Sequence, residues 1–250
     1  MASLLKIAVA GDKPIALVLA GHNGSGKSTL WYDRLADALE IPLVNADRLT
    51  LSLLPPVAED QKLKQWAERL RDEDERWQKL SQDGVQLFMG LIMDQGMYFS
   101  FETVFSYFQR QSDGTFRSKI DTITALQEHG YFVILLFVGL ASAELSILRV
   151  ATRKSQGGHA VPDAKLRSRF PRTQQAIRMA SAVADMTLMF DNSRSFAQAF
   201  TLVRAQTREA VLYDCRDPRF ISDAKLQKVA ELWLPKVAPA KEKSPASATS

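Results

Sequence analysis

The stretch LVLAGHNGSGKSTL, residues 17–30, holds the side chains and the spacing best suited to chemistry in this sequence. It matches the pattern G-x-x-x-x-G-K-[ST], in which glycines let successive backbone N–H groups point inward around a phosphate. Lys27 is placed to reach the β- and γ-phosphates of a nucleoside triphosphate, and the Ser28 hydroxyl to ligate Mg²⁺. The loop therefore predicts a phosphate site. The residues expected to bind the nucleotide here are Gly21, His22, Asn23, Gly24, Ser25, Gly26, Lys27, Ser28 and Thr29.

The surroundings of this loop fit a unit of strand, loop and helix. An apolar run, 15–20, precedes the loop, and leucines at helical spacing follow it. The helix that begins near Lys27 would add its positive N-terminal end to the phosphate site. A dinucleotide fold fits less well, because GSGKST lacks the third Gly or Ala of G-x-G-x-x-G. We interpret the ring of His22 as part of the loop and not as a catalyst.

Two carboxylates and a hydroxyl stand where apolar runs end. Asp47 follows the run 41–46, and Glu102 and Thr103 follow FSF. Ligands bind at the carboxyl ends of the strands in an open α/β sheet, so these side chains should border the phosphate site. Asp47 is placed to accept the proton of an attacking hydroxyl, or instead to cap the helix that follows. Glu102 is a candidate for Mg²⁺ together with Ser28, for a substrate hydroxyl, or for a structural hydrogen bond at the strand end.

A cationic segment, 149–178, holds six Arg and two Lys against one Asp. A charge run is often a solvated face, but the density here and the pair Gly157-Gly158 predict a lid that closes over the transferring phosphoryl group. We expect Arg149 at the nucleotide, Arg153 and Arg169 at the transferring group, and His159 and Arg167 at the substrate.

Five short runs of apolar and β-branched residues lack helical spacing, which predicts strands buried on both faces of a parallel sheet. Segments of helical length separate them, so strands and helices alternate along the chain. The runs are 15–20, 41–46, 97–102, 131–140 and 186–191. We therefore expect an α/β P-loop kinase fold with a five-stranded parallel sheet covered by helices on both sides.

The connection 48–96 is longer than a crossover needs and predicts a helical insertion on the acceptor side of the site. Its large apolar side chains are expected to pack in the core, and the charged run RDEDER, 71–76, to be a solvated tip. We expect one domain over 1–235 and a disordered tail over 236–250, where Pro, Ala, Ser and Lys leave little to bury. The apolar set of the insertion is Leu63, Trp66, Leu70, Trp77, Leu80, Phe88 and Leu91.

Composition narrows the class of protein. The net charge of +4 falls to +2 without the tail, which is too little to predict nucleic acid as a partner. No apolar run reaches the roughly 18 residues of a membrane span, and the first residues show no convincing signal peptide. The lone cysteine, Cys215, excludes an intrachain disulfide and suits the cytoplasm.

The motifs AGHNGSGKST, VNADR, FSFETVFS, GGHAVP and FDNS, taken in this order, resemble those of the zeta-toxin family of P-loop kinases. The resemblance spans roughly residues 15–195. It implies an adenylate-kinase-like core that phosphorylates a hydroxyl with ATP or GTP and Mg²⁺. The best-known acceptor of the family is UDP-N-acetylglucosamine, and a toxin of this family implies a cognate antitoxin as a possible partner.

The resemblance also implies roles for single residues. Lys27 and Ser28 correspond to the residues for phosphate and Mg²⁺, and Asp47 to the catalytic base. Glu102 and Thr103 correspond to the acceptor-side strand end, Arg153 to a lid arginine, and Asn192 to a residue near the nucleotide base. The second lid arginine has several candidates, which are His159, Arg167 and Arg169. The FET strand end also departs from the Glu-Gly-Thr of the well-known toxins.

Two other functions stay open. The acceptor could be another hydroxyl, such as that of a nucleoside, a dinucleotide, an antibiotic or a nucleic-acid 5′ end. The chain could also be a nucleotide-dependent binding switch without an acceptor. A switch usually carries an Asp at the end of an apolar strand to hold Mg²⁺, and the strand 131–140 ends without one.

Overall fold

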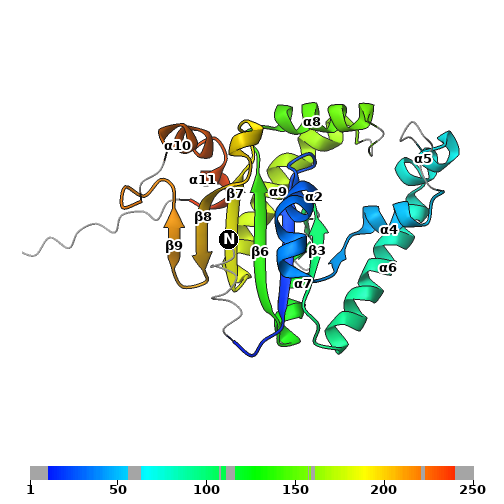
Figure 1. The fold of residues 1–250 in the computed structure, drawn as a ribbon, viewed down its shortest axis with the longest axis horizontal. Coiled ribbons are helices and arrows are strands. Elements are labelled where there is room, and N and C mark those ends of the chain that lie inside the picture. The colour runs from blue at the N-terminus through cyan, green and yellow to red at the C-terminus, as the bar shows by residue number, and fades with distance from the viewer. Residues whose placement is uncertain are drawn as a thin grey trace, which may run out of the picture.

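The computed structural model describes residues 11–55, 63–106, 108–110, 116–156, 158, 161–220 and 223–239. These residues form a seven-stranded sheet with the strand order β2-β3-β1-β6-β7-β8-β9 (Figure 1). The strands of this sheet are β1 (Ile15–Gly21), β2 (Leu43–Val44), β3 (Phe99–Thr103), β6 (Phe132–Gly139), β7 (Met186–Asp191), β8 (Thr201–Thr207) and β9 (Val211–Asp214). A separate antiparallel pair joins β4 (Phe108–Arg110) to β5 (Phe116–Ser118).

The five strands expected from the sequence are the five parallel strands of this sheet. β1 lies between β3 and β6 and pairs in parallel with both. Every residue of β1 and of β7 is buried, as continuous apolar runs predict for strands covered on both faces. The parallel core was therefore predicted correctly.

The expected count of five strands was too low, because β8 and β9 extend the sheet in antiparallel fashion. The sequence of β8, TLVRAQT, mixes apolar and polar residues, and β9 has only four residues. Neither gives the continuous apolar run used to identify the other strands. Antiparallel strands at a sheet edge need no such run, since one of their faces can meet polar groups or solvent.

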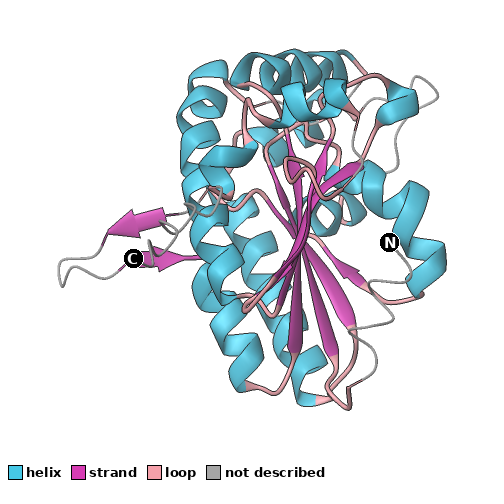
Figure 2. Ribbon diagram, turned by 90° about the vertical axis from the view of Figure 1, so that its left-hand side faces the viewer, coloured by secondary structure: helices cyan, strands magenta, loops and turns pink. Residues whose placement is uncertain are grey.

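Helices cover both faces of the sheet (Figure 2). On one face, Leu30, Trp31 and Leu35 pack against the odd-numbered residues of β1. On the other, Ile177 and Trp233 belong to the core that includes Ala16, Val18 and Ala20. The helical segments are α2 (Lys27–Leu30), η1 (Trp31–Leu35), α3 (Ala36–Leu39), α4 (Ala46–Ser52), α5 (Gln65–Asp72), α6 (Glu75–Asp94), α7 (Ile120–Glu128), α8 (Ala143–Ser155), α9 (Asp163–Val183), η2 (Phe196–Gln198), α10 (Ala224–Ala230) and α11 (Leu234–Val237).

The expected insertion is helical and comprises α4, α5 and α6, which stand beside the sheet (Figure 1). Leu63 is buried with Leu54 and Ala67 in a small cluster of its own, against which Leu70 and Trp77 pack. The expectation of core packing was wrong for four other side chains of the insertion, because the insertion has too little neighbouring structure to cover them. These exposed residues are Trp66, Leu80, Phe88 and Leu91.

The folded body continues beyond the boundary expected at residue 235. Val237 and Ala238 are buried, and Arg216 Nη2 donates a hydrogen bond to the Ala238 carbonyl at 2.9 Å. Residues 240–250, the rest of the expected tail, lie outside the described residues. Among the helices that the structure describes, none has the length and apolar character needed to cross a membrane.

Candidate active site

The loop after β1 has the backbone that its glycines predict. Gly24 and Gly26 have φ values of 69° and 89°, in the left-handed region where a side chain is strained. A Cβ on Gly26 would also lie 2.7 Å from the Asn192 side-chain nitrogen. That nitrogen donates to the Ser25 carbonyl at 2.8 Å. The structure thus places Asn192 against the loop backbone, where it holds the loop's shape.

Helix α8 supports the other side of the loop. The Ser146 hydroxyl donates to the Asn23 carbonyl at 2.7 Å, and the Arg149 Cβ lies next to Gly24. Burial lowers the pKa of the Arg149 guanidinium, and the charge of Asp191 opposes this shift. Of the arginines expected in the lid, Arg149 is thus one that lies directly against the phosphate loop.

Lys27 is buried at the start of α2 and lies against the loop itself. Its Nζ donates to the carbonyls of Gly21 and His22 at 3.3 and 3.1 Å and lies 3.8 Å from Glu102 Oε1. Burial lowers the pKa of the Lys27 ammonium; Glu102 and Asp47 oppose the shift, whereas Arg153 adds to it. Lys27, Glu102, Asp47 and Arg153 therefore share one electrostatic environment.

Glu102 is held by two donors at the edge of the loop. The Ser28 hydroxyl donates to its two carboxylate oxygens at 3.1 and 3.0 Å, and Asn45 Nδ2 donates to Oε2 at 2.7 Å. β3 pairs directly with β1 and places Glu102 opposite Leu19. The next residue, Thr103, is half-buried, and its hydroxyl accepts a hydrogen bond from the Phe105 N–H at 3.3 Å.

The pair of Ser28 and Glu102 fits Mg²⁺. This ion is commonly bound by one or two carboxylates together with the phosphates of a substrate. A hydroxyl and a carboxylate in direct contact beside the phosphate loop provide such a partial set. No group of three or more His, Cys, Asp or Glu side chains suited to a metal lies among the described residues.

Asp47 does not cap helix α4. The N-cap of α4 is Asn45, whose Oδ1 accepts a hydrogen bond from the Arg48 N–H at 3.2 Å. Asp47 lies in the first turn of α4, and its charge opposes the lowering of the pKa that burial causes in Lys27 and in Arg169. The capping alternative is thus excluded, and the carboxylate lies within electrostatic range of the phosphate loop and of the lid.

The lid arginines point in different directions. Arg169 is half-buried on α9, where burial and Arg172 lower the pKa of its guanidinium and Asp47 raises it. Arg167 is exposed and pairs with Glu144 of α8 at 2.6 Å, so this guanidinium ties the two lid helices together. His159 lies outside the described residues.

His22 is buried and stacked on Phe170 of α9, with ring centroids 3.8 Å apart. Burial, and then the charge of Lys27, lower the pKa of this imidazole to about 3. Neither ring nitrogen has a hydrogen-bond partner among the described residues. The ring is therefore neutral near pH 7, and the backbone carbonyl of His22 is the group that contacts Lys27. Thr29, the last predicted loop residue, is exposed in α2.

Sequence reasoning missed Arg71, which it took for part of a solvated tip. The side chain is only 8% exposed, and its Nε and Nη2 donate to Asp72 at 2.6 and 2.9 Å. Nη2 also lies 3.4 Å from the Gly158 carbonyl of the lid. The run RDEDER does not predict this contact, because no pattern within the run shows which of its charged side chains is buried.

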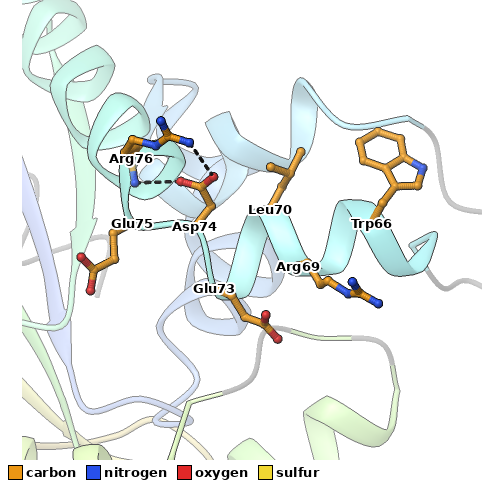
Figure 3. Close-up of a pocket in the computed structure, with 7 residues that line it drawn as sticks. All are labelled: Trp66, Arg69, Leu70, Glu73, Asp74, Glu75 and Arg76. Atoms are coloured by element: carbon orange, nitrogen blue, oxygen red, sulfur yellow. Dashed lines mark hydrogen bonds and ion pairs between the residues drawn. The ribbon is translucent and has the colours of Figure 1, made fainter.

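A cavity of about 690 Å³ lies on the insertion, lined by α5 and the start of α6 (Figure 3). The cavity is lined by both acidic and basic side chains. Asp74 caps helix α6 by accepting hydrogen bonds from the Arg76 and Trp77 N–H groups. None of its lining residues belongs to the phosphate loop, so we do not assign the chemistry to it. The residues that line it are Trp66, Arg69, Leu70, Glu73, Asp74, Glu75 and Arg76.

A parallel α/β sheet with a lysine-bearing glycine loop, a strand-end carboxylate and an arginine-rich lid defines a P-loop phosphotransferase. A family model described as Zeta toxin matches residues 2–217, and the chain belongs to this family. The loop is accordingly a nucleotide-binding loop.

Solved structures share the fold. One comes from the PezAT chromosomal toxin–antitoxin system of Streptococcus pneumoniae, at 15% identity and a TM-score of 0.52, with 98% of this chain and 87% of that chain covered. Another is AvrRxo1-ORF1:-ORF2 with ATP, at 17% identity and a TM-score of 0.58, with 97% and 70% covered. A comparison with curated proteins finds no match.

Proposed function

We propose that this protein transfers the γ-phosphoryl group of ATP or GTP to a hydroxyl of a small molecule. The observation that carries the proposal is the cluster at the carboxyl edge of the sheet. There Glu102 lies 3.0 Å from Ser28 and 3.8 Å from Lys27, and Asp47 is not used as a cap. Glu102 is suited to Mg²⁺, which leaves Asp47 as a second acid available to an acceptor hydroxyl.

Each group has a role in this reaction. Lys27 would leave the loop carbonyls for the β- and γ-phosphates, and Asp47 would accept the proton of the attacking hydroxyl. Arg153 and Arg169 would balance charge that develops on the transferring group. Mg²⁺, when bound, would neutralise charge on the phosphate oxygens, and Ser28 and Glu102 are the residues suited to hold it.

The acceptor that family membership favours is a nucleotide sugar such as UDP-N-acetylglucosamine. The FET strand end differs from the Glu-Gly-Thr of the well-known toxins, so another hydroxyl acceptor is the second candidate. Because structural neighbours include toxin–antitoxin systems, we extend the proposal to a cognate antitoxin as a protein partner.

Transfer of labelled γ-phosphate tests the proposal. The protein is mixed with labelled ATP or GTP and Mg²⁺, and with either UDP-N-acetylglucosamine or a pool of bacterial metabolites, and the product is identified by mass. We expect a phosphorylated small molecule with the wild type and none with Lys27→Ala, because that variant lacks the phosphate-binding ammonium. Slow hydrolysis that no acceptor accelerates would contradict transfer and favour the switch.

A further inference from the structure

Asn45 contacts Glu102, precedes Asp47 by two residues, and uses both ends of its amide. Its Oδ1 accepts from the Arg48 N–H at 3.2 Å and starts helix α4. Its Nδ2 donates to Glu102 Oε2 at 2.7 Å, a shorter hydrogen bond than the two that the Ser28 hydroxyl makes to the same carboxylate. One side chain thus joins the first turn of α4 to the end of β3.

We propose that Asn45 is a positioning residue that sets Asp47 and Glu102 relative to each other. It fixes Asp47 by fixing where α4 begins, because Asp47 lies two residues beyond this cap. It fixes Glu102 directly through the amide nitrogen. The inference deepens the proposed function, on which the roles of Asp47 and Glu102 rest.

The same hydrogen bond also engages the carboxylate oxygen that does not pair with Lys27. Glu102 Oε1 lies 3.8 Å from Lys27 Nζ, which is longer than the usual 2.7–2.9 Å of a charged hydrogen bond. The amide of Asn45 holds Oε2, and the hydroxyl of Ser28 contacts both carboxylate oxygens. Without Asn45, the buried Lys27 would be the strongest donor left to Glu102, and a tighter ion pair would compete with phosphate for both groups.

Only an amide fits this position. Aspartate would cap α4 but would set a second carboxylate against Glu102, where like charges repel. Serine would cap the helix about as well as asparagine, but its single short hydroxyl lacks the separate amide nitrogen that donates to Glu102. The helix cap and the Glu102 contact can therefore be separated by substitution.

The test compares Asn45→Ser with Asn45→Asp and measures melting temperature, kcat, KM and the Mg²⁺ dependence of nucleotide binding. We expect Asn45→Ser to melt near the wild type, to lose about 10- to 100-fold in kcat, and to need more Mg²⁺ for nucleotide binding. This is the usual scale for removing a group that orients a metal ligand. Asn45→Asp should lose more kcat than Asn45→Ser and should recover partly at high Mg²⁺.

The matched control is Asp74→Ser, a cap replacement on α6 outside the phosphate loop. This variant should leave both kcat and Mg²⁺ dependence unchanged.

A double-mutant cycle with Glu102→Gln assigns the effect to the contact. The Asn45→Ser change in Mg²⁺ dependence should vanish in the Glu102→Gln background, because the amide then has no carboxylate to hold. Additive effects, or a wild-type Mg²⁺ dependence in Asn45→Ser, would overturn the inference. The Mg²⁺ dependence of nucleotide binding can be measured without an acceptor. A protein that binds Mg²⁺ and nucleotide but transfers phosphate to nothing would refute the proposed function, and the binding data would still test the role of Asn45.

Discussion

At the scale of single residues, His22 shows how the phosphate loop excludes water. The ring lies between Phe170, which it stacks on, and Phe137, which it meets edge-on. Its two ring nitrogens are buried and unpaired among the described residues, and a charged imidazole there would cost far more than a neutral one. The loop therefore uses histidine as a flat, uncharged surface for helix α9.

This burial predicts a pH-dependent stability. The pKa of His22 is about 3 in the folded protein against an ordinary value of 6.5, so below pH 6.5 the unfolded chain binds a proton that the folded chain does not. Stability from this group is complete above pH 6.5 and is lost as the pH falls toward 3. His22→Phe keeps the stacking and removes the titration. Denaturant unfolding at pH 7 and pH 5 should show the variant losing about 2 kcal/mol less than the wild type over this interval. Equal losses in both proteins would show that the ring is accessible to protons.

At the scale of elements, the expected lid comprises parts of two helices that contact the phosphate loop through different groups. α8 contacts the loop through Ser146 and Arg149, and α9 contacts it through the Phe170 ring. The charge density of 149–178 predicts from the sequence that this segment is a lid, and its closure over the site stays a prediction. The direction of each guanidinium was not predictable, because it depends on how each helix is rotated about its axis.

Arg153 and Arg167 provide a matched pair for the lid. Both side chains are exposed, but the charge of Arg153 acts on Lys27, whereas Arg167 is paired with Glu144. We expect Arg153→Ala to lower kcat far more than nucleotide affinity, because its guanidinium acts on charge that develops during transfer. Arg167→Ala should change either quantity less than about threefold, since exposed pairs contribute under about 1 kcal/mol. Steady-state kinetics with direct nucleotide titration measures both. Equal losses of kcat and affinity in Arg153→Ala would assign it to ground-state binding.

At the scale of the whole molecule, the parallel strands of the sheet and the edge at which they end could be predicted from the sequence. Those features follow from local patterns: continuous apolar runs for β1, β6 and β7, and polar residues placed where β2 and β3 end. The antiparallel strands β8 and β9, the buried Arg71 and the bridging Asn45 depend on contacts between distant segments. No local pattern reports such contacts, so the structure was needed to find them.

The C-terminal boundary can be tested by truncation. Removing 236–250 deletes the buried Val237 and the Ala238 carbonyl that accepts from Arg216. Burial of a valine and one such hydrogen bond together contribute about 2–4 kcal/mol, so the melting temperature should fall by roughly 5 °C or more. Removing only 240–250 is the control, and its composition predicts a small change. Equal melting temperatures for the two truncations would place the true boundary before residue 236.

The central claim is that Asp47 takes the proton of an acceptor hydroxyl at this site. Asp47→Asn keeps the shape of the side chain but cannot accept a proton at neutral pH. The control is Asp37→Asn, which alters an exposed aspartate in the first turn of α3. Rates of γ-phosphoryl transfer to the identified acceptor, with nucleotide affinity measured in parallel, decide the claim. The account predicts a fall of roughly 10²- to 10⁴-fold for Asp47→Asn with unchanged nucleotide affinity, and no fall for the control. A folded Asp47→Asn protein that transfers at the wild-type rate would contradict it.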